Sequence, residues 1–218
     1  MRFPFESGGI IYDYIKASDL KPVIDVVRRY FGPLETMNRA VGVQPEDFDI
    51  FANVIGTIAL DEGLSLVARN AVTGEFIAPV ILKDFITKIP ESTFEYSPKL
   101  LPIFGMIDDL ADMFTGGRGH VERNDVLELF IGLMPPEYQN MGITTTLWNA
   151  SQYVAKEHGF NSVVSTITGG ASSHIALNKL GFNLLYEIPY KTYNFSGKQV
   201  FAGIRETETC KFVEKVVA

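Results

Sequence analysis

The segment from Val126 to Gly159 constrains the fold of this chain most, because it predicts a buried strand, a loop and a helix in direct succession. Residues 126–134 form an apolar run, rich in β-branched and aromatic side chains, that only Glu128 interrupts. Such a run is typical of a strand buried on both faces in the middle of a sheet. Apolar residues then recur at helical spacing over residues 143–154, and Gly159 follows where a helix cap favours positive φ.

The loop between this strand and this helix predicts a phosphate-binding site. A chain that leaves a buried strand and begins a helix carries unpaired backbone N–H groups at the positive end of the helix dipole. Backbone groups in this arrangement bind phosphate. The loop and the first helical turn consist of Gln139, Asn140, Met141, Gly142, Ile143 and Thr144.

Composition limits the class of protein. A chain of 218 residues with 46% hydrophobic content can bury one sizeable core, so we expect a single domain over residues 1–218. The net charge of −7 argues against nucleic-acid binding, and the lone Cys210 argues against a disulfide or a cysteine-rich metal site. We expect no metal. With no signal sequence and no run of membrane-spanning length, we expect a cytoplasmic protein off the membrane, monomeric or weakly dimeric.

The spacing of apolar residues and the positions of turn residues predict the other helices and strands, which together indicate an α/β fold. We expect a surface loop over residues 115–124, and the tail after Glu206 carries no clear pattern. The strand after the central helix should run parallel to the central strand, because such crossovers are right-handed. The expected elements are a strand at 10–15, three helices within 18–60, a hairpin at 64–82, a helix at 97–114, a strand at 161–167, a short helix at 172–181, and strands at 182–190 and 199–205.

This order of elements resembles the Gcn5-related N-acetyltransferase (GNAT) superfamily. Gln139 and Gly142 match its Gln/Arg-x-x-Gly-x-Gly/Ala pyrophosphate motif, in which Thr144 stands where Gly or Ala is usual. Residues 178–182, Asn-Lys-Leu-Gly-Phe, resemble its second signature, a short helix beside the cofactor that ends in Lys-Leu-Gly-Phe. The segments RRYFGPL at 28–34 and EGLSLVA at 62–68 are similar to the animal arylalkylamine N-acetyltransferase-like branch, so the resemblance covers nearly the whole chain.

The resemblance implies the GNAT fold, a single mixed sheet of about seven strands with helices on both faces. It also implies acetyl-CoA as co-substrate and a small amine as acceptor. Backbone N–H groups around Leu133 and Met134 would then polarise the thioester, and Asn178 would lie beside the cofactor. Two departures concern proton transfer. Gly32 stands where insect enzymes of this branch carry a glutamate, and Leu177 where many members of the superfamily carry a tyrosine.

Acetyl transfer to an amine needs a neutral amine, a polarised carbonyl and a protonated leaving thiolate. We interpret Glu128 as a candidate base, since it is a carboxylate in an apolar strand; the alternative places it at an exposed strand end. Water and Glu35 are the other candidates for proton removal. Ser173 could donate to the thiolate or cap its helix, and His174 ranks below Glu128.

Three functions fit these patterns. The first is an acetyl-CoA-dependent N-acetyltransferase that acts on the primary amine of a small molecule, of the arylalkylamine type. The second is an acyl-CoA-binding protein of the same fold that has lost catalysis, which the residues at positions 32 and 177 favour. The third is an unrelated nucleotide-binding domain, which the absence of a Gly-Lys-Ser/Thr sequence in the loop disfavours.

Overall fold

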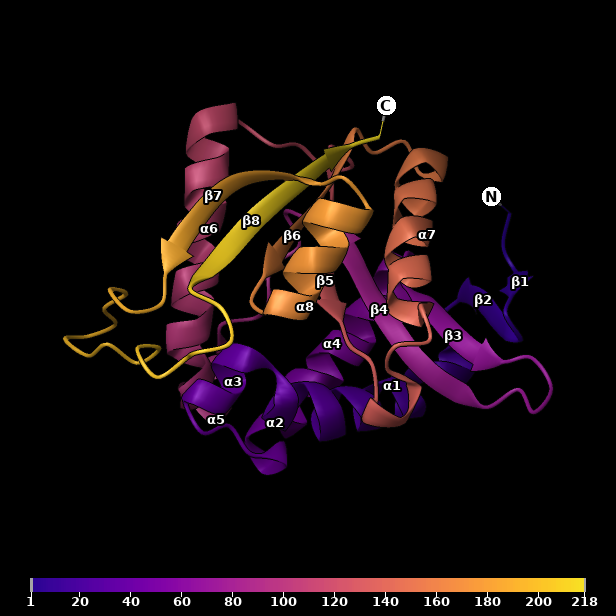
Figure 1. Ribbon diagram of the computed structural model, residues 1–218, viewed down its shortest axis with the longest axis horizontal. Helices are drawn as coiled ribbons and strands as arrows, with labels where there is room; N and C mark the ends of the chain where they lie inside the picture. Colours follow the sequence, from indigo (N-terminus) through magenta and orange to yellow (C-terminus); the bar gives the residue numbers. More distant parts are fainter. Residues whose placement is uncertain (1, 218) are drawn as a thin grey trace.

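The computed structural model describes residues 2–217, which build one mixed sheet of eight strands in the order β1-β2-β3-β4-β5-β6-β8-β7 (Figure 1). Neighbouring strands are antiparallel except β5 and β6, which are parallel. The strands are β1 (Phe5–Ser7), β2 (Ile10–Tyr14), β3 (Leu66–Asn70), β4 (Phe76–Asp84), β5 (Val126–Gly132), β6 (Ser162–Ile167), β7 (Asn183–Pro189) and β8 (Thr209–Val216).

Helices connect the strands. The helices are α1 (Leu20–Val26), α2 (Gly32–Leu34), α3 (Thr36–Ala40), α4 (Asp49–Glu62), α5 (Ser92–Tyr96), α6 (Leu101–Arg118), α7 (Ile143–Glu157) and α8 (Gly170–Ser173). Wider π-helical turns extend α1 over Val27–Phe31 and α8 over His174–Lys179. Shorter 3₁₀ turns lie at Ala17–Asp19, Pro45–Phe48, Pro98–Leu100 and Pro136–Tyr138. Within residues 2–217, none of these helices combines the length and the apolar character that crossing a membrane requires.

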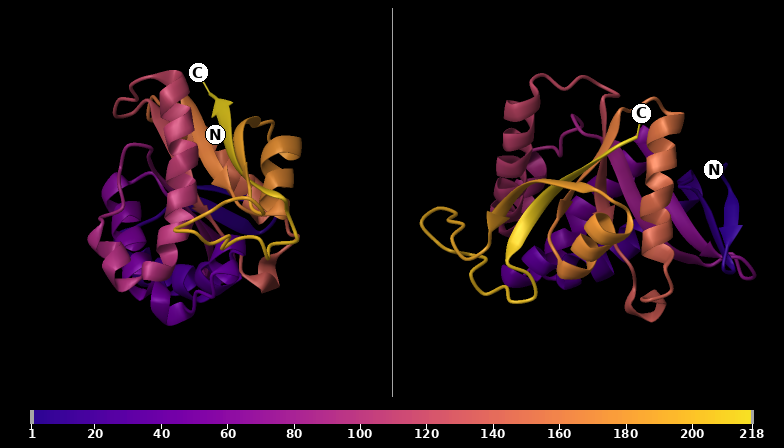
Figure 2. Two further views of the ribbon diagram at one scale, coloured as in Figure 1. Left: turned by 90° about the vertical axis from the view of Figure 1, so that its left-hand side faces the viewer. Right: turned by 45° about the horizontal axis from the view of Figure 1, so that its top comes forward.

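Two hydrophobic cores lie on opposite faces of the sheet. Side chains of α1, α4 and α6, such as Phe51 and Leu110, pack on one face, where Val67 and Ile81 point toward them. Side chains of α7, such as Val154, pack on the other face together with Ala176 of the turn after α8. In the left view of Figure 2, α6 and α8 accordingly lie on opposite sides of the strands. The expected mixed sheet with helices on both faces is confirmed.

The strand, loop and helix of residues 126–159 have the predicted order. β5 is buried for most of its length and ends at Gly132, two residues before the predicted end. α7 begins at Ile143, and Gly159 follows it with a φ of 80°. This left-handed conformation favours glycine, so the C-terminal end of α7 follows the predicted capping rule.

The structure has eight strands where about seven were expected, because β1 is an addition, and the end of the chain also folds differently from its sequence pattern. Residues 199–205, predicted as a strand, form local turns in which Ala202 N–H donates to Gln199 O and Ile204 N–H donates to Phe201 O. The tail after Glu206, to which no structure was assigned, forms β8 and inserts between β6 and β7. The short β1 at the other edge of the sheet is also an addition.

The surface loop predicted over residues 115–124 is wrong in its first half, because α6 continues through two glycines to Arg118. The second of them, Gly117, fits a helix packed closely on the sheet. A Cβ atom at Gly117 would lie 2.6 Å from the Tyr186 hydroxyl of β7. The helix ends at Gly119, whose φ of 90° interrupts the helical conformation.

Candidate active site

The two parallel strands at the centre of the sheet separate. β5 and β6 pair at three positions, the last being Glu128 with Val164. Beyond this point the backbone of residues 129–132 lacks a ladder partner on β6. One side-chain hydrogen bond bridges the start of the gap, in which the Ser165 hydroxyl donates to Leu129 O at 2.8 Å. The separation leaves backbone N–H and C=O groups of β5 free to bind another molecule.

A bulge on the other side of β5 changes the direction of its side chains. Pairing with β4 shifts by one residue, since Ile131 faces Ile81 whereas Leu129 faces Leu82. Phe130 is the extra residue, and its ring lies near that of Phe104 on α6, with centroids 6.5 Å apart. Bulges commonly re-aim a side chain at a functional site.

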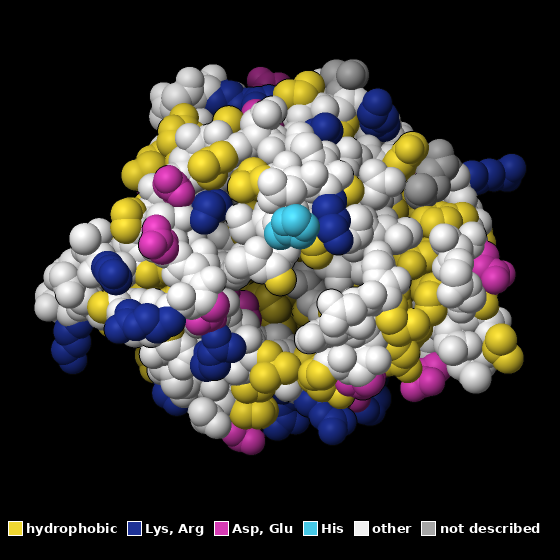
Figure 3. All heavy atoms as spheres, viewed as in Figure 1, with side chains coloured by type: hydrophobic (Ala, Val, Ile, Leu, Met, Phe, Trp, Pro, Cys, Tyr) yellow, Lys and Arg dark blue, Asp and Glu magenta, His cyan; other side chains and the backbone are white. Residues whose placement is uncertain are grey.

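A continuous hollow occupies the gap between the strands. We call its deep part the inner pocket; aromatic rings from α4, α6 and β5 line much of it. The outer pocket, of about 710 Å³, extends from there to the loop before α7 and to the start of α8. Figure 3 shows the hollow on the face below α8, with hydrophobic side chains in its depth. The residues that line both pockets are Phe31, Glu35, Gly132, Trp148, Thr168 and Ser172.

The residues expected to hold the cofactor partly converge on the outer pocket. Those that line it are Leu133, Met134, Gln139, Asn140 and Thr144. Gly142 is the N-terminal cap residue of α7, with a φ of 78°, and Asn140 before it has a φ of 62°. The loop therefore adopts a left-handed conformation at the positions where the sequence carries glycine and asparagine, the residues that tolerate it best.

Besides Gly142, three residues expected to contact the cofactor lie outside the lining of the outer pocket. Met141 is 58% exposed on the loop, and Ile143, the first residue of α7, is buried in the core on that face of the sheet. Asn178 lies exposed on the turn that extends α8. Contacts of these three residues with a cofactor stay predictions.

Glu128 is buried, as its interpretation as a candidate base requires, and it lines the inner pocket. Its carboxylate does not stand alone there. Lys83 on β4 lies directly opposite in the ladder, and its ammonium donates to Glu128 Oε2 at 2.5 Å. A base that takes a proton from an amine would have to act while it holds this cation. The role of Glu128 as a base stays a prediction.

The start of α8 brings Ser172, rather than Ser173, to the pockets. The Ser172 hydroxyl donates to Gly169 O at 2.9 Å. Ser173 is absent from the lining of both pockets, and His174 is exposed on the following turn. The one-residue offset follows from the helical periodicity, which places successive side chains on different sides of the helix.

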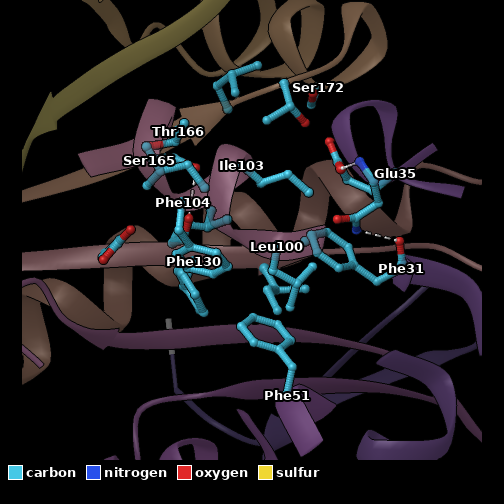
Figure 4. Close-up of a pocket in the computed structure, with 18 of the residues that line it drawn as sticks. Phe31, Glu35, Phe51, Leu100, Ile103, Phe104, Phe130, Ser165, Thr166 and Ser172 are labelled. Atoms are coloured by element: carbon cyan, nitrogen blue, oxygen red, sulfur yellow. Dashed lines mark hydrogen bonds between the residues drawn. The ribbon is translucent and has the colours of Figure 1, made fainter. Parts of the chain in front are cut away.

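Glu35 is a half-buried titratable residue that lines both pockets. It precedes α3 as its N-terminal cap, where Oε1 accepts from Met37 N–H at 3.0 Å and Oε2 from Asn38 N–H at 2.8 Å. Burial raises the pKa of the Glu35 carboxyl, although hydrogen bonds from the Thr168 hydroxyl and from these two N–H groups act in the opposite direction. In Figure 4, Glu35 and Ser172 lie at one end of the inner pocket, and Phe104 and Phe130 at the other.

The site can therefore support proton transfer next to a channel for an extended ligand. A carboxylate offers about four lone-pair positions, so the two cap hydrogen bonds leave Glu35 able to accept a proton. The sequence favours Glu128 over Glu35, because a glutamate two residues after Pro33 carries no sign of burial. Trp148 and Thr168 carry no functional signal in the sequence, since the first fits an ordinary helix pattern and the second the turn after a strand.

Neither family profiles nor curated protein sequences match this chain. Solved structures do match it. The C-terminal condensation domain of Ebony in complex with β-alanyl-dopamine superposes with a TM-score of 0.84 at 18% identity, over 95% of this chain and 99% of that one. Arylalkylamine N-acetyltransferase 2 from Aedes aegypti gives 0.81 at 18% identity, over 97% and 100%.

A polyamine N-acetyltransferase from Drosophila melanogaster that catalyses the formation of N-acetylagmatine gives a TM-score of 0.74 at 17% identity, over 95% of this chain and 99% of that one. The chain is thus similar over nearly its whole length to insect arylalkylamine N-acetyltransferase-like structures. At these identities the likeness establishes the fold. The chain has the GNAT fold, which confirms the fold that the resemblance implied.

Proposed function

We propose that this protein is an acetyl-CoA-dependent N-acetyltransferase that acetylates the primary amine of a small molecule, of the arylalkylamine type. The observation that carries the proposal is the position of Glu35, a carboxylate with a raised pKa that lines both pockets beside the gap between β5 and β6. A base is most effective when its pKa lies closer to the working pH than that of an ordinary carboxylate.

The outer pocket has the groups that acetyl-CoA requires. The backbone around Gln139, Asn140 and Gly142 would hold the pyrophosphate at the N-terminal end of α7. Backbone groups near Leu133 and Met134, just beyond the end of β5, would hold the thioester. The likeness to solved N-acetyltransferases supports this assignment.

The inner pocket suits an amine with an aryl group. Phe51 packs against Phe48 and Phe104, with ring centroids 4.8 Å and 5.5 Å apart, and these rings form its apolar wall. Aromatic rings bind another aromatic ring by tilted or offset contacts. An arylalkylamine would then extend its amino group from this wall toward Glu35.

Proton transfer in the reaction can be assigned to residues of the pockets. Glu35 takes a proton from the ammonium form of the acceptor, and the free amine nitrogen bonds to the thioester carbon. The carbon–sulfur bond then breaks, and the new amide nitrogen loses the extra proton that it still carries. A hydroxyl relays that proton, giving its own to the departing thiolate and regaining one from the nitrogen. Ser172, whose hydroxyl lies beside both pockets, is better placed than Ser173 to give that proton.

The test compares two variants, in each of which one glutamate is replaced by glutamine. Glu35→Gln should lower the rate constant for transfer roughly 10²–10⁴-fold while acetyl-CoA still binds. Glu128→Gln is the matched control, because it also neutralises a glutamate that lines the inner pocket. A large loss in Glu128→Gln alone would return the role of base to Glu128. Unfolding curves of both variants separate the lost cap of α3 from lost chemistry.

A second candidate is an acyl-CoA-binding protein without catalysis. Gly32 favours it, because a Cβ atom at this position would lie 3.2 Å from Phe48 Cγ, so the packing of the helix disfavours a glutamate there. The discriminating measurement is coenzyme A release with a panel of arylalkylamines and polyamines. Release at the rate of background hydrolysis with every amine, in a protein that binds acetyl-CoA, would favour this second candidate.

A further inference from the structure

Trp148 on α7 is the only tryptophan in the sequence, and its side chain is 3% exposed. The indole N–H is fully buried and has no hydrogen-bond partner among residues 2–217. Buried donors in native proteins are nearly always paired, and an unpaired donor inside a pocket is often the place of a missing ligand atom. The phosphate-binding role proposed for the loop before α7 does not explain this donor.

The indole lies on the end of β5. Gly132 is the last residue of that strand, and a Cβ atom there would lie only 2.5 Å from Trp148 Nε1. The missing side chain of Gly132 is therefore what makes room for the indole. Both residues line the inner and the outer pocket. The indole is thus held where the two pockets join and where β5 has lost its partner strand, with its N–H packed against Gly132.

We propose that the indole N–H of Trp148 donates a hydrogen bond to the carbonyl oxygen of the acyl group during transfer, as a catalytic residue in addition to the backbone of β5. This inference rests on the proposed acyltransferase function. When the amine nitrogen bonds to the carbonyl carbon, the π electrons of the carbonyl move to its oxygen, which gains negative charge. The indole stabilises this charge and keeps its own proton. When the carbon–sulfur bond breaks, the charge leaves with the sulfur.

A buried and prearranged donor of this kind is effective because it needs no reorientation while charge develops. The orientation of the N–H is fixed by packing, since the indole lies against Gly132 and belongs to the hydrophobic core that α7 forms with its face of the sheet. The other side chains named for the reaction act on the proton of the amine or on the thiolate. Trp148 would act on the third centre of charge, the oxygen.

A single tryptophan makes the test direct, because the protein labelled with ¹⁵N gives one indole N–H signal. The expected result is a downfield shift of the indole proton when acetyl-CoA is added without an amine, and little change with coenzyme A, which lacks the carbonyl. Equal shifts with both ligands would mean a contact with the pantetheine arm and would overturn the inference. No shift with acetyl-CoA, despite binding shown by a raised melting temperature, would overturn it and leave the proposed function standing. No binding of acetyl-CoA would overturn both.

Kinetics supply the second readout. Trp148→Phe keeps an aromatic ring and removes the N–H, and we expect kcat to fall about 10- to 100-fold with little change in the KM for acetyl-CoA, somewhat less than for a sole oxyanion donor. Gly132→Ala keeps the N–H but displaces the indole, so it should also lower kcat. A packing role alone would change the melting temperature and KM without this loss. A folded Trp148→Phe with the kcat of the wild type would refute the role.

Discussion

Lys83 and Glu128 form an ion pair inside the protein, across directly opposed positions of β4 and β5. Their side chains are 5% and 9% exposed, and the Lys83 ammonium also donates to Thr87 O at 2.9 Å. Removing one charge of such a pair leaves the other without compensation in a poorly solvated place. The pair lies where the two central strands begin to separate, so it supports the floor of the inner pocket.

Lys83→Met should destabilise the protein by about 3–5 kcal/mol, because it leaves the Glu128 carboxylate buried without a counter-charge. Lys83→Met combined with Glu128→Leu should recover most of that loss, since no buried charge then remains. Urea unfolding of the wild type, the single variants and the double variant measures the coupling. A loss below about 1 kcal/mol in Lys83→Met would mean that the pair behaves like one on the surface.

The pH dependence of transfer should reveal Glu35. The pKa of this carboxyl is raised above its ordinary value of 4.5, so the base becomes protonated, and inactive, at a higher pH than an exposed glutamate would. In the wild type, log kcat/KM should rise with pH at a slope of about one while Glu35 ionises and then level off, because ionised Glu35 takes its proton from the ammonium form of the acceptor. Glu35→Gln can use only the free amine, so log kcat/KM should keep rising at a slope of about one until the amine itself is neutral. A level region that survives in Glu35→Gln would exclude Glu35 as the group that takes the proton.

Two glycines at opposite ends of α7 separate cofactor binding from helix stability. Gly142 and Gly159 have φ values of 78° and 80°, and a Cβ atom at either position would meet no atom within 4 Å. Valine should therefore strain the backbone similarly at both positions. Acetyl-CoA at a hundredfold excess over its Kd should stabilise the wild type by about 2.7 kcal/mol. We expect Gly159→Val to retain the resulting shift in melting temperature and Gly142→Val to lose it. Equal shifts in the two variants would contradict the phosphate-binding role of the loop.

Cys210 should be inert in the native protein. Its thiol is completely buried in β8, and burial raises its pKa to about 12. Thiolate is the reactive form, so both access and ionisation are suppressed at neutral pH. Ellman's reagent should therefore label the native protein only as fast as β8 opens, and label it at once in urea. Stoichiometric reaction of the native protein within seconds would show that β8 is not held in the sheet as described.

The sequence predicted the parts of this fold that short segments encode. β5, the loop and α7 are contiguous, so one apolar run, two prolines and a helical period were sufficient. The place of β8 could not be predicted in this way, because strand order depends on pairing between distant segments. Glu128 is another such case. Its pattern indicated burial, but its partner Lys83 lies 45 residues earlier and on a different strand. Glu35 likewise gains its environment from Thr168, which the chain supplies much later.

The position of β8 between β6 and β7 has a consequence for the protein during its synthesis. Until residues 209–216 have left the ribosome, β7 has no neighbour in the described sheet and β6 has an open edge. Unpaired strand edges are templates for pairing with other chains. A nascent chain that has made α7 and its loop is thus exposed to misassociation, and chaperones that shield strand edges would act on it at this stage. In the described sheet, the strand that is translated last is therefore the one that pairs the open edge of β6.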